Sequence, residues 1–136
     1  MITAVDSSVL LDVLTAAPEF GPASLDALQR CAAEGSIVAC DVVWAETSAA
    51  FATEQDAERE LAALGVRFSG VDAHTAAAAG SAFRSYRKRG GPRDRVVADF
   101  LVGAHGQAQA DRLLTRDRGF YRSYFSRLTI VDPTKP

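Results

Sequence analysis

Short apolar runs alternate along the chain with longer stretches in which apolar residues recur every three or four positions. The short runs are typical of buried strands and lie at residues 2–5, 36–40, 66–71, 112–115 and 128–131. The longer stretches predict helices at residues 7–15, from Ser24 or Asp26 to about Glu34, at 42–53, 54–65, from Asp72 to the basic residues before 90, and at 94–106, with a short helical turn at 120–125. Strands that alternate with helices predict parallel β-α-β units. The expected fold class is a three-layer α/β/α sandwich with a central, mostly parallel sheet.

Polar residues and glycines support the ends of these elements. Asp6, Asp41 and Asp72 stand at helix starts, where a short side chain accepts hydrogen bonds from free backbone N–H groups. Gly65 fits the end of a helix, and a break rich in proline and glycine occupies residues 17–24. The 136 residues show no internal repeat, so a single domain is expected over the whole chain.

The composition is that of a soluble globular protein, with 48% hydrophobic and 24% charged residues. No apolar run approaches the roughly 20 residues that span a bilayer. The first residues lack the basic start and long apolar core of a signal peptide. Cys31 and Cys40 are too far apart for a C-x-x-C motif, so reduced thiols are expected. These features favour a cytoplasmic protein without a membrane partner.

Charge is distributed unevenly along the chain, although the net charge is only −2. Residues 1–72 carry three basic against twelve acidic side chains, a net charge of −9. Residues 73–136 carry twelve basic against five acidic side chains, a net charge of +7. Six basic residues and one acid lie between Arg84 and Arg95. This asymmetry fits a polyanionic partner or a bipolar surface used in assembly, and a solvated helix end is the simpler alternative.

Four acidic residues stand where a ligand site is expected. Parallel sheets bind ligands beyond the C-terminal ends of their strands. Asp6 directly follows the first predicted strand, and Asp117 follows the strand at 112–115 after one residue. Glu46 is the only charged residue between positions 42 and 53, and Asp99 is the only one between positions 96 and 106. A buried carboxylate without a partner is costly, so these isolated acids need an explanation.

Each acid has a structural explanation when it is considered alone. Asp6 fits a helix N-cap, Glu46 fits an outward position on its helix, and Asp117 fits a charged turn. Asp99 has Arg95 four residues before it, the spacing of a helical ion pair. If the four instead converge at one end of the sheet, their repulsion is relieved by one or two hard divalent cations. Carboxylate oxygens suit Mg²⁺ or Mn²⁺, and the lack of cysteine or histidine in the set disfavours zinc.

A divalent cation in such a site fits the hydrolysis of phosphodiester bonds. The ion lowers the pKa of a bound water and stabilises the oxygens of an in-line displacement at phosphorus. Gly103 lies one helical turn beyond Asp99, where a missing side chain either leaves the carboxylate uncrowded or allows close helix packing.

Four sequence blocks resemble those of the PIN-domain ribonucleases and, within them, the VapC toxins of bacterial type II toxin–antitoxin pairs. The blocks are AVDSSVLLDVL, VVWAE, DRVVADFLVGAH and LLTRDRGFY, in the order and spacing of that family. The resemblance covers nearly the whole chain. It implies a PIN fold, a Mg²⁺- or Mn²⁺-dependent endoribonuclease activity, a location in the bacterial cytoplasm and inhibition by a VapB-like antitoxin. A homodimer is also expected.

The resemblance also assigns residues by position. The four acids of the family, which hold the metal and are catalytic, fall on Asp6, Glu46, Asp99 and Asp117. A hydroxyl that supports the last acid falls on Thr115, and the small hydroxylated position after the first acid falls on Ser7 or Ser8. Contacts to the RNA backbone are expected from arginines, because lysine is scarce. The candidates are Arg84, Arg87, Arg89, Arg93, Arg95, Arg116 and Arg118.

Other residues receive structural expectations. His74 and His105 are expected to be structural, and Trp44 to pack in the core or an interface, whereas base stacking is considered for Tyr86, Tyr121 and Tyr124. Asp12 is expected to face solvent or a partner. The apolar segments at 10–20 and 58–65 are candidate docking surfaces for an antitoxin segment or a second copy of the chain.

Two other function classes compete with the nuclease. A receiver-type phosphoryl-transfer domain also has an acidic pocket on a parallel sheet, but it needs a lysine near the acids. Lys88 lies instead in the basic cluster and Lys135 near the C-terminus. A non-catalytic module that binds RNA or an antitoxin is the second alternative, and it predicts no Mg²⁺ or Mn²⁺ binding that depends on Asp99.

Overall fold

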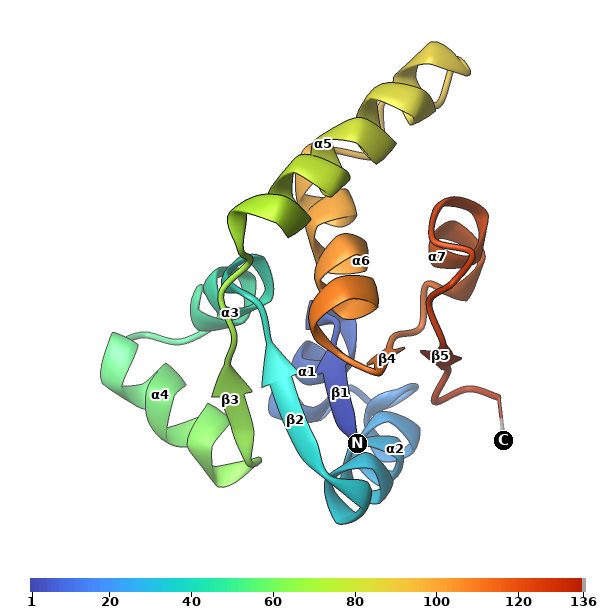
Figure 1. Cartoon of the computed structure of the whole chain (residues 1–136). Coiled ribbons are helices and arrows are strands. Elements are labelled where there is room, and N and C mark those ends of the chain that lie inside the picture. The colour runs from blue at the N-terminus through green and yellow to red at the C-terminus, as the bar shows by residue number, and fades with distance from the viewer. Residues whose placement is uncertain (136) are drawn as a thin grey trace.

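Five parallel strands form a single sheet in the order β3-β2-β1-β4-β5 (Figure 1). The computed structural model describes residues 1–135. The strands are β1 (Ile2–Val5), β2 (Ser36–Ala39), β3 (Val66–Phe68), β4 (Arg112–Leu114) and β5 (Ile130–Val131). The helices are α1 (Ser7–Leu14), α2 (Gly21–Glu34), α3 (Asp41–Ser48), α4 (Glu54–Ala63), α5 (Ala73–Lys88), α6 (Val97–Gln109) and α7 (Arg118–Tyr124).

The central strand β1 is buried because it has a neighbour on each side. Thr3, Ala4 and Val5 are at most 2% exposed. Among the helices, α2 packs against β2, α4 against β3, and α6 against both β1 and β4. Helices therefore cover the sheet, as expected for parallel strands joined by helical crossovers. The predicted three-layer α/β/α fold is confirmed, and the four strand pairings within residues 1–135 are all parallel.

Several helix boundaries differ from the sequence prediction, and α6 covers Val97–Gln109 rather than 94–106. Helix α2 begins at Gly21, with Pro22 in its first turn, rather than at Ser24 or Asp26. Proline suits the first turn because its missing N–H is not needed there. Helix α3 ends at Ser48 and does not continue through residue 53. Thr53 instead caps α4, because its hydroxyl oxygen accepts a hydrogen bond from the backbone N–H of Asp56 at 3.1 Å.

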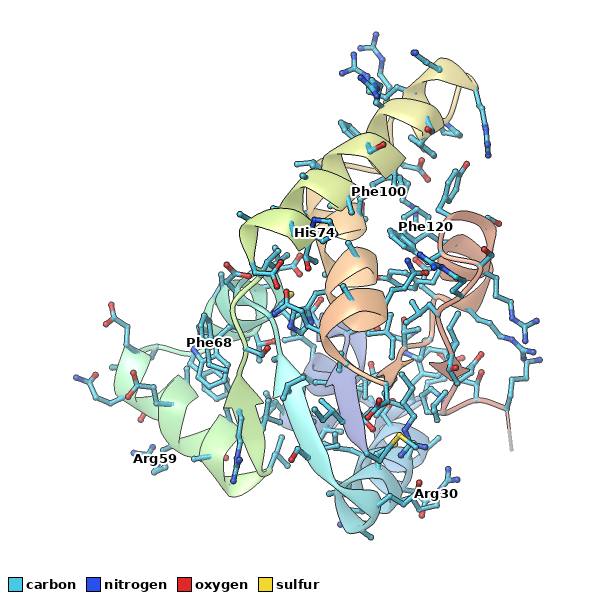
Figure 2. All side chains as sticks on the ribbon, viewed as in Figure 1. Arg30, Arg59, Phe68, His74, Phe100 and Phe120 are labelled. Carbon is cyan, nitrogen blue, oxygen red and sulfur yellow. The ribbon has the colours of Figure 1, made fainter. Side chains whose placement is uncertain are left out.

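Helices α5 and α6 pack side by side (Figure 1). Helix α5 extends away from the sheet and ends among the basic residues at 84–95. Phe100 of α6 lies at the centre of an aromatic cluster. Its ring centroid is 5.2 Å from that of Phe120 in α7 and 5.4 Å from those of Phe83 and Tyr86 in α5. Figure 2 shows Phe100 and Phe120 between α6 and α7. This cluster fixes the position of α7 and of the loop that precedes it.

None of the helices within residues 1–135 combines the length and apolar character needed to cross a membrane.

Candidate active site

Neighbouring strands bring Asp6 and Thr115 together. Val5 of β1 pairs with Leu114 of β4, so the next residue of each strand lies at the same end of the sheet. The backbone N–H of Asp6 donates to the Leu114 carbonyl at 2.9 Å. The Thr115 hydroxyl donates to Asp6 Oδ2 at 2.7 Å, and Thr115 is fully buried. The first acid is therefore held by the strand that leads to the fourth.

Asp6 is a buried carboxylate that is held by hydrogen bonds. It is the N-cap of α1, where Oδ1 accepts from the backbone N–H of Ser7 at 2.8 Å. The Tyr121 hydroxyl donates to Oδ2 at 3.3 Å. Within residues 1–135 no ion pair includes Asp6. Burial raises the pKa of Asp6 above its usual value, the hydrogen bonds from Thr115, Ser7 and Tyr121 oppose that rise, and the charge of Asp117 adds to it.

Asp117 contacts the same residue, Thr115, and forms an ion pair with Arg95. Its backbone N–H donates to Thr115 Oγ1 at 3.0 Å. Its Oδ2 accepts from Arg95 at 2.6 Å, and the Arg95 guanidinium lies 4.2 Å from the centre of the Phe120 ring. The ion pair between Arg95 and Asp99 that the four-residue spacing suggested is not the one that forms. Helix α6 begins at Val97 with Val96 as its N-cap, so Arg95 lies before the helix and outside the helical geometry that this pairing needs.

Asp99 and Glu46 have separate local partners. Asp99 is in the first turn of α6, where its Oδ2 accepts from the backbone N–H of Val96 at 2.9 Å. Glu46 is exposed on α3, and its Oε1 accepts from the Ser7 hydroxyl at 3.1 Å. Ser7 thus contacts two of the four acids, Asp6 through its backbone and Glu46 through its side chain.

The Tyr121 hydroxyl donates to Asp6 and also experiences the charges of two other acids. Burial raises the pKa of Tyr121 far above its ordinary value, and the negative charges of Asp6, Asp99 and Asp117 raise it further. Tyr121 was not predicted as a partner of the acids. Its position four residues after Asp117, one helical turn along α7, is the sequence signal that points to it. Base stacking is excluded for Tyr121 and Tyr86, because they are only 2% and 4% exposed.

The donor set suits a hard cation, although the carboxylates do not surround one point. Within residues 1–135, no three histidine, cysteine, aspartate or glutamate side chains form a group that would hold a metal ion as they stand. The donors that are present are carboxylate oxygens, the ligand type that Mg²⁺ and Mn²⁺ prefer. Asp6 has no positive partner among residues 1–135, whereas Asp117 forms an ion pair with Arg95. The chemistry of these residues therefore fits a divalent metal, whose binding stays a prediction.

Asp12 and Arg116 anchor the loop that carries Asp117. Asp12 is 6% exposed, so the expectation that it faces solvent or a partner is wrong. Arg116 donates to both Asp12 oxygens, at 2.7 and 3.1 Å, and the Ser24 hydroxyl donates to Asp12 at 2.9 Å. The Arg116 guanidinium also lies 4.1 Å from the centre of the Phe20 ring. This ion pair joins the loop after β4 to α1, the helix that Asp6 caps.

The remaining arginine candidates lie at two places. Arg118 is half-buried at the start of α7. Arg84, Arg87, Arg89 and Arg93 are exposed at the end of α5 and in the following loop. The guanidinium of Arg87 lies 5.7 Å from the centre of the Phe83 ring.

Both histidines lie outside the acid cluster, the set of Asp6, Glu46, Asp99 and Asp117. His105 is 1% exposed, and its Nε2 is 3.0 Å from the Ser69 hydroxyl oxygen, as expected for a structural histidine. His74 is exposed on α5 (Figure 2). Trp44 packs edge-on against Phe68 at 5.5 Å between centroids.

Gly103 serves helix packing. A Cβ built on Gly103 would lie 2.3 Å from the Phe125 ring, so the glycine lets that ring approach α6 closely. This is the second of the two explanations that the sequence left open. Cys31 and Cys40 are both buried and free.

Comparisons with known proteins agree with this architecture. The sequence matches the PIN domain family model over residues 3–126. Among curated proteins, no sequence matches the chain at a significant level. The fold is similar to VapBC2 from Rickettsia felis bound to a DNA fragment from their promoter, with a TM-score of 0.75 and 16% identity over 97% of this chain and 98% of that chain. It is also similar to VapBC-1 from nontypeable Haemophilus influenzae, with a TM-score of 0.74 and 16% identity over 99% and 100%.

A third similar structure is FitAcB from Neisseria gonorrhoeae, with a TM-score of 0.68 and 20% identity over the full length of both chains. At these identities the structural matches establish the fold. The family model spans most of the chain and includes all four acids. This protein therefore belongs to the PIN-domain family.

Proposed function

We propose that the chain is a metal-dependent endoribonuclease and the toxin of a bacterial type II toxin–antitoxin pair, neutralised by a VapB-like antitoxin. The observation that carries the proposal is the position of Asp6, a buried carboxylate that forms no ion pair within residues 1–135 and is joined to Asp117 through Thr115 at the C-terminal end of a parallel sheet. Ligand sites of such sheets lie at this end. The PIN-domain family supports a nuclease, and several structures with this fold are described as VapBC complexes.

The residues of the proposed site have distinct roles. Asp6, Glu46, Asp99 and Asp117 would hold Mg²⁺ or Mn²⁺ directly or through water. The ion supplies an activated water and stabilises charge on the phosphoryl oxygens. The Thr115 hydroxyl orients Asp6 and accepts a hydrogen bond from the backbone N–H of Asp117. Ser7 positions Asp6 and Glu46.

Arginines of the proposed site would bind the RNA backbone. Arg95 lies against Asp117, and its guanidinium is suited to bidentate contact with a phosphate. Arg84, Arg87, Arg89 and Arg93 form an exposed positive segment that attracts a polyanion, and Arg118 lies beside Asp117. Arg116 is engaged by Asp12, so we assign it to loop anchoring rather than to RNA.

The proposal includes the antitoxin and the assembly state. The Arg95–Asp117 pair supports inhibition by an antitoxin arginine, because a guanidinium already fits against one of the acids. An apolar pocket lined by Val13, Pro18, Pro22 and Leu25 supports the segment at 10–20 as a docking surface. We further propose a homodimer that acts in the bacterial cytoplasm.

The decisive experiment maps the cleavage ends of cellular RNA after expression of the wild-type chain and of two variants, Asp6→Ala and Asp99→Asn. New 5′ ends that require Mg²⁺ or Mn²⁺ are expected only with the wild-type chain, while both variants keep the circular dichroism spectrum of the wild type. Full activity in both variants would exclude the assigned site. RNA binding without cleavage by the wild-type chain would favour a non-catalytic module.

The toxin role requires its own test. Expression of the wild-type chain alone is expected to stop growth, and coexpression of a neighbouring antitoxin is expected to restore it. Normal growth during expression of the soluble chain would contradict the toxin role and leave the nuclease assignment intact.

A further inference from the structure

A cavity of about 470 Å³ lies between the last turns of α5 and the loop that leads to α6. Phe83 and Tyr86 of α5 line one side, and Arg87, Arg93 and Arg95 provide its charge. The volume falls in the range of about 300–1,000 Å³ that is usual for small-molecule sites. The cavity thus combines aromatic surface with three guanidinium groups.

Specific contacts hold the loop in place beside α5. The backbone N–H of Gly91 donates to the Tyr86 carbonyl at 3.0 Å, and the Tyr86 hydroxyl donates to the Pro92 carbonyl. Gly91 also lies against the Tyr86 ring, because a Cβ at this position would be 2.5 Å from it. Tyr86 is itself buried against Phe100 and Tyr124. The loop side of the cavity is therefore tied to the aromatic core.

The charge of the cavity favours an anion. Its lining includes three arginines. Arg95 is paired with Asp117, and Asp94 of the same loop accepts from the Tyr86 hydroxyl at 3.4 Å, so Arg87 and Arg93 supply the remaining positive charge. Arg95 belongs both to this lining and to the acid site, since it donates to Asp117 at 2.6 Å. The cavity therefore adjoins the proposed catalytic acids through one shared residue. An extended anionic ligand that occupies both the cavity and the acid site would pass along Arg95.

We propose that this cavity is a nucleotide subsite for the RNA strand, in which Arg87 and Arg93 bind a phosphate and Phe83 receives a base. The inference rests on the proposed function, which supplies RNA as the substrate. Aromatic rings stack on any base, and arginine binds phosphate through paired N–H groups. An acidic peptide would use the arginines but would need an aromatic side chain of its own to stack on Phe83, whereas every nucleotide carries a base. The subsite would hold the strand without sequence preference, beside the cleavage site.

Binding of RNA separates this subsite from catalysis. The probe is a fluorescein-labelled single-stranded RNA octamer, titrated with the full chain carrying Asp99→Asn in EDTA, so that no cleavage occurs. In this background Arg87→Gln with Arg93→Gln is expected to weaken binding about tenfold. The slope of log K against log salt should fall by about 0.7 for each lost phosphate contact. Arg67→Gln, at an exposed arginine on edge strand β3, is the matched control and should bind like its parent.

Phe83→Leu tests the base contact. Loss of stacking is expected to weaken binding at least fivefold with an unchanged salt slope. Circular dichroism and the melting temperature check that the variant stays folded, and Phe83→Tyr, which keeps an aromatic face, should restore binding.

Several other outcomes would overturn the subsite, and one would overturn only the catalytic assignment. If the double arginine variant binds like Arg67→Gln, or if the Asp99→Asn chain binds no RNA, the cavity is not an RNA subsite. If the double arginine variant loses RNA affinity but Phe83→Leu does not, the cavity binds phosphate and has no base site. Tighter binding of poly-glutamate than of RNA, with the same arginine dependence, would assign the cavity to an acidic protein. Cleavage that does not need Asp99, together with binding that needs Arg87, would instead refute the catalytic assignment alone.

Discussion

Arg95 donates to the Asp117 carboxylate at 2.6 Å while the face of its guanidinium lies 4.2 Å from the centre of the Phe120 ring. The hydrogen bond to Asp117 raises the pKa of Arg95, and the charges of Asp117 and Asp99 add to the rise. Arg95 is therefore a permanent positive charge at the edge of the acid cluster. It lowers the repulsion among the acids and competes with any other cation for Asp117.

Replacing Arg95 should strengthen metal binding. Arg95→Gln removes a positive charge next to Asp117, and repulsion on the order of 1 to 2 kcal/mol at an intermediate dielectric corresponds to about tenfold in affinity. Calorimetric titration with Mn²⁺ in the absence of RNA measures this change, with Arg67→Gln as the control. Equal or weaker Mn²⁺ affinity in Arg95→Gln would show that Arg95 does not compete with the ion.

Thr115 should matter for activity more than for stability. Thr115→Val keeps the shape of the side chain but loses the donor to Asp6 and the acceptor for the Asp117 N–H. Groups that orient metal ligands contribute about 10- to 100-fold to affinity or activity, so a loss of that size in RNA cleavage is expected. Thr115→Ser keeps the hydroxyl and should retain most of the activity. A Thr115→Val chain as active as the wild type would contradict the assigned role.

The buried pair of Asp12 and Arg116 should stabilise the fold more than a surface pair does. Asp12→Asn leaves the guanidinium without its counter-charge, which is expected to lower the free energy of unfolding by about 2 to 4 kcal/mol. Asp26→Asn breaks the pair with Arg30, whose side chains are 69% and 58% exposed, and should cost less than about 1 kcal/mol. Urea unfolding followed by circular dichroism compares the two variants. Equal effects would mean that burial adds nothing to the Asp12 pair.

Two glycines in helices should respond oppositely to alanine. At Gly103 a methyl group would lie 2.3 Å from the Phe125 ring, and overpacking of this kind costs about 1 to 3 kcal/mol. At Gly80 of α5 nothing lies within 4 Å, so alanine should stabilise the helix by about 0.5 to 1 kcal/mol. Thermal unfolding of Gly103→Ala and Gly80→Ala tests both signs. If Gly103→Ala were more stable than the wild type, Phe125 could not pack against Gly103 as described.

His105 should make the fold sensitive to mild acid. Burial lowers the pKa of His105 below its usual value, and the charge of Asp41 opposes this change in part. Below about pH 6.5 the unfolded chain takes up a proton that the folded chain does not, so stability falls as the pH decreases. The largest slope from one proton is about 1.4 kcal/mol per pH unit. His105→Gln should remove this contribution between pH 7 and 5, whereas His74→Gln should leave it. Parallel stability curves for the wild type and His105→Gln would contradict this reasoning.

Local patterns located the strands and helices because burial imposes a spacing on the apolar residues. The boundaries that were wrong depend on other elements. Ser24 was expected to begin a helix because its hydroxyl is a good cap. In the structure that hydroxyl donates to Asp12 of α1, and Gly21 begins α2 three residues earlier. A contact of this kind leaves no mark in the local sequence.

Three acids of the site could be selected because each is isolated in an apolar segment, and Asp117 because it follows a predicted strand after one residue. The residues that pair with these acids could not be predicted, because the pairing depends on how distant segments of the chain pack together. Asp12 and Arg116 are separated by 104 residues, and nothing near Asp12 indicates an ion pair. The pairing of Arg95 with Asp117 similarly depends on the course of the loop between α5 and α6.

The hydrogen bond between Thr115 and Asp6 joins residues that are 109 positions apart. Protein synthesis proceeds from the N-terminus, so Asp6 and Glu46 emerge from the ribosome long before Asp99, Thr115 and Asp117. A nascent chain that ends before β4 contains three of the acids and lacks Thr115 and Asp117, which complete their surroundings. Assembly of the acid cluster thus waits until translation is nearly finished. For the proposed ribonuclease, a growing polypeptide would therefore lack the complete site while its own messenger RNA is within reach.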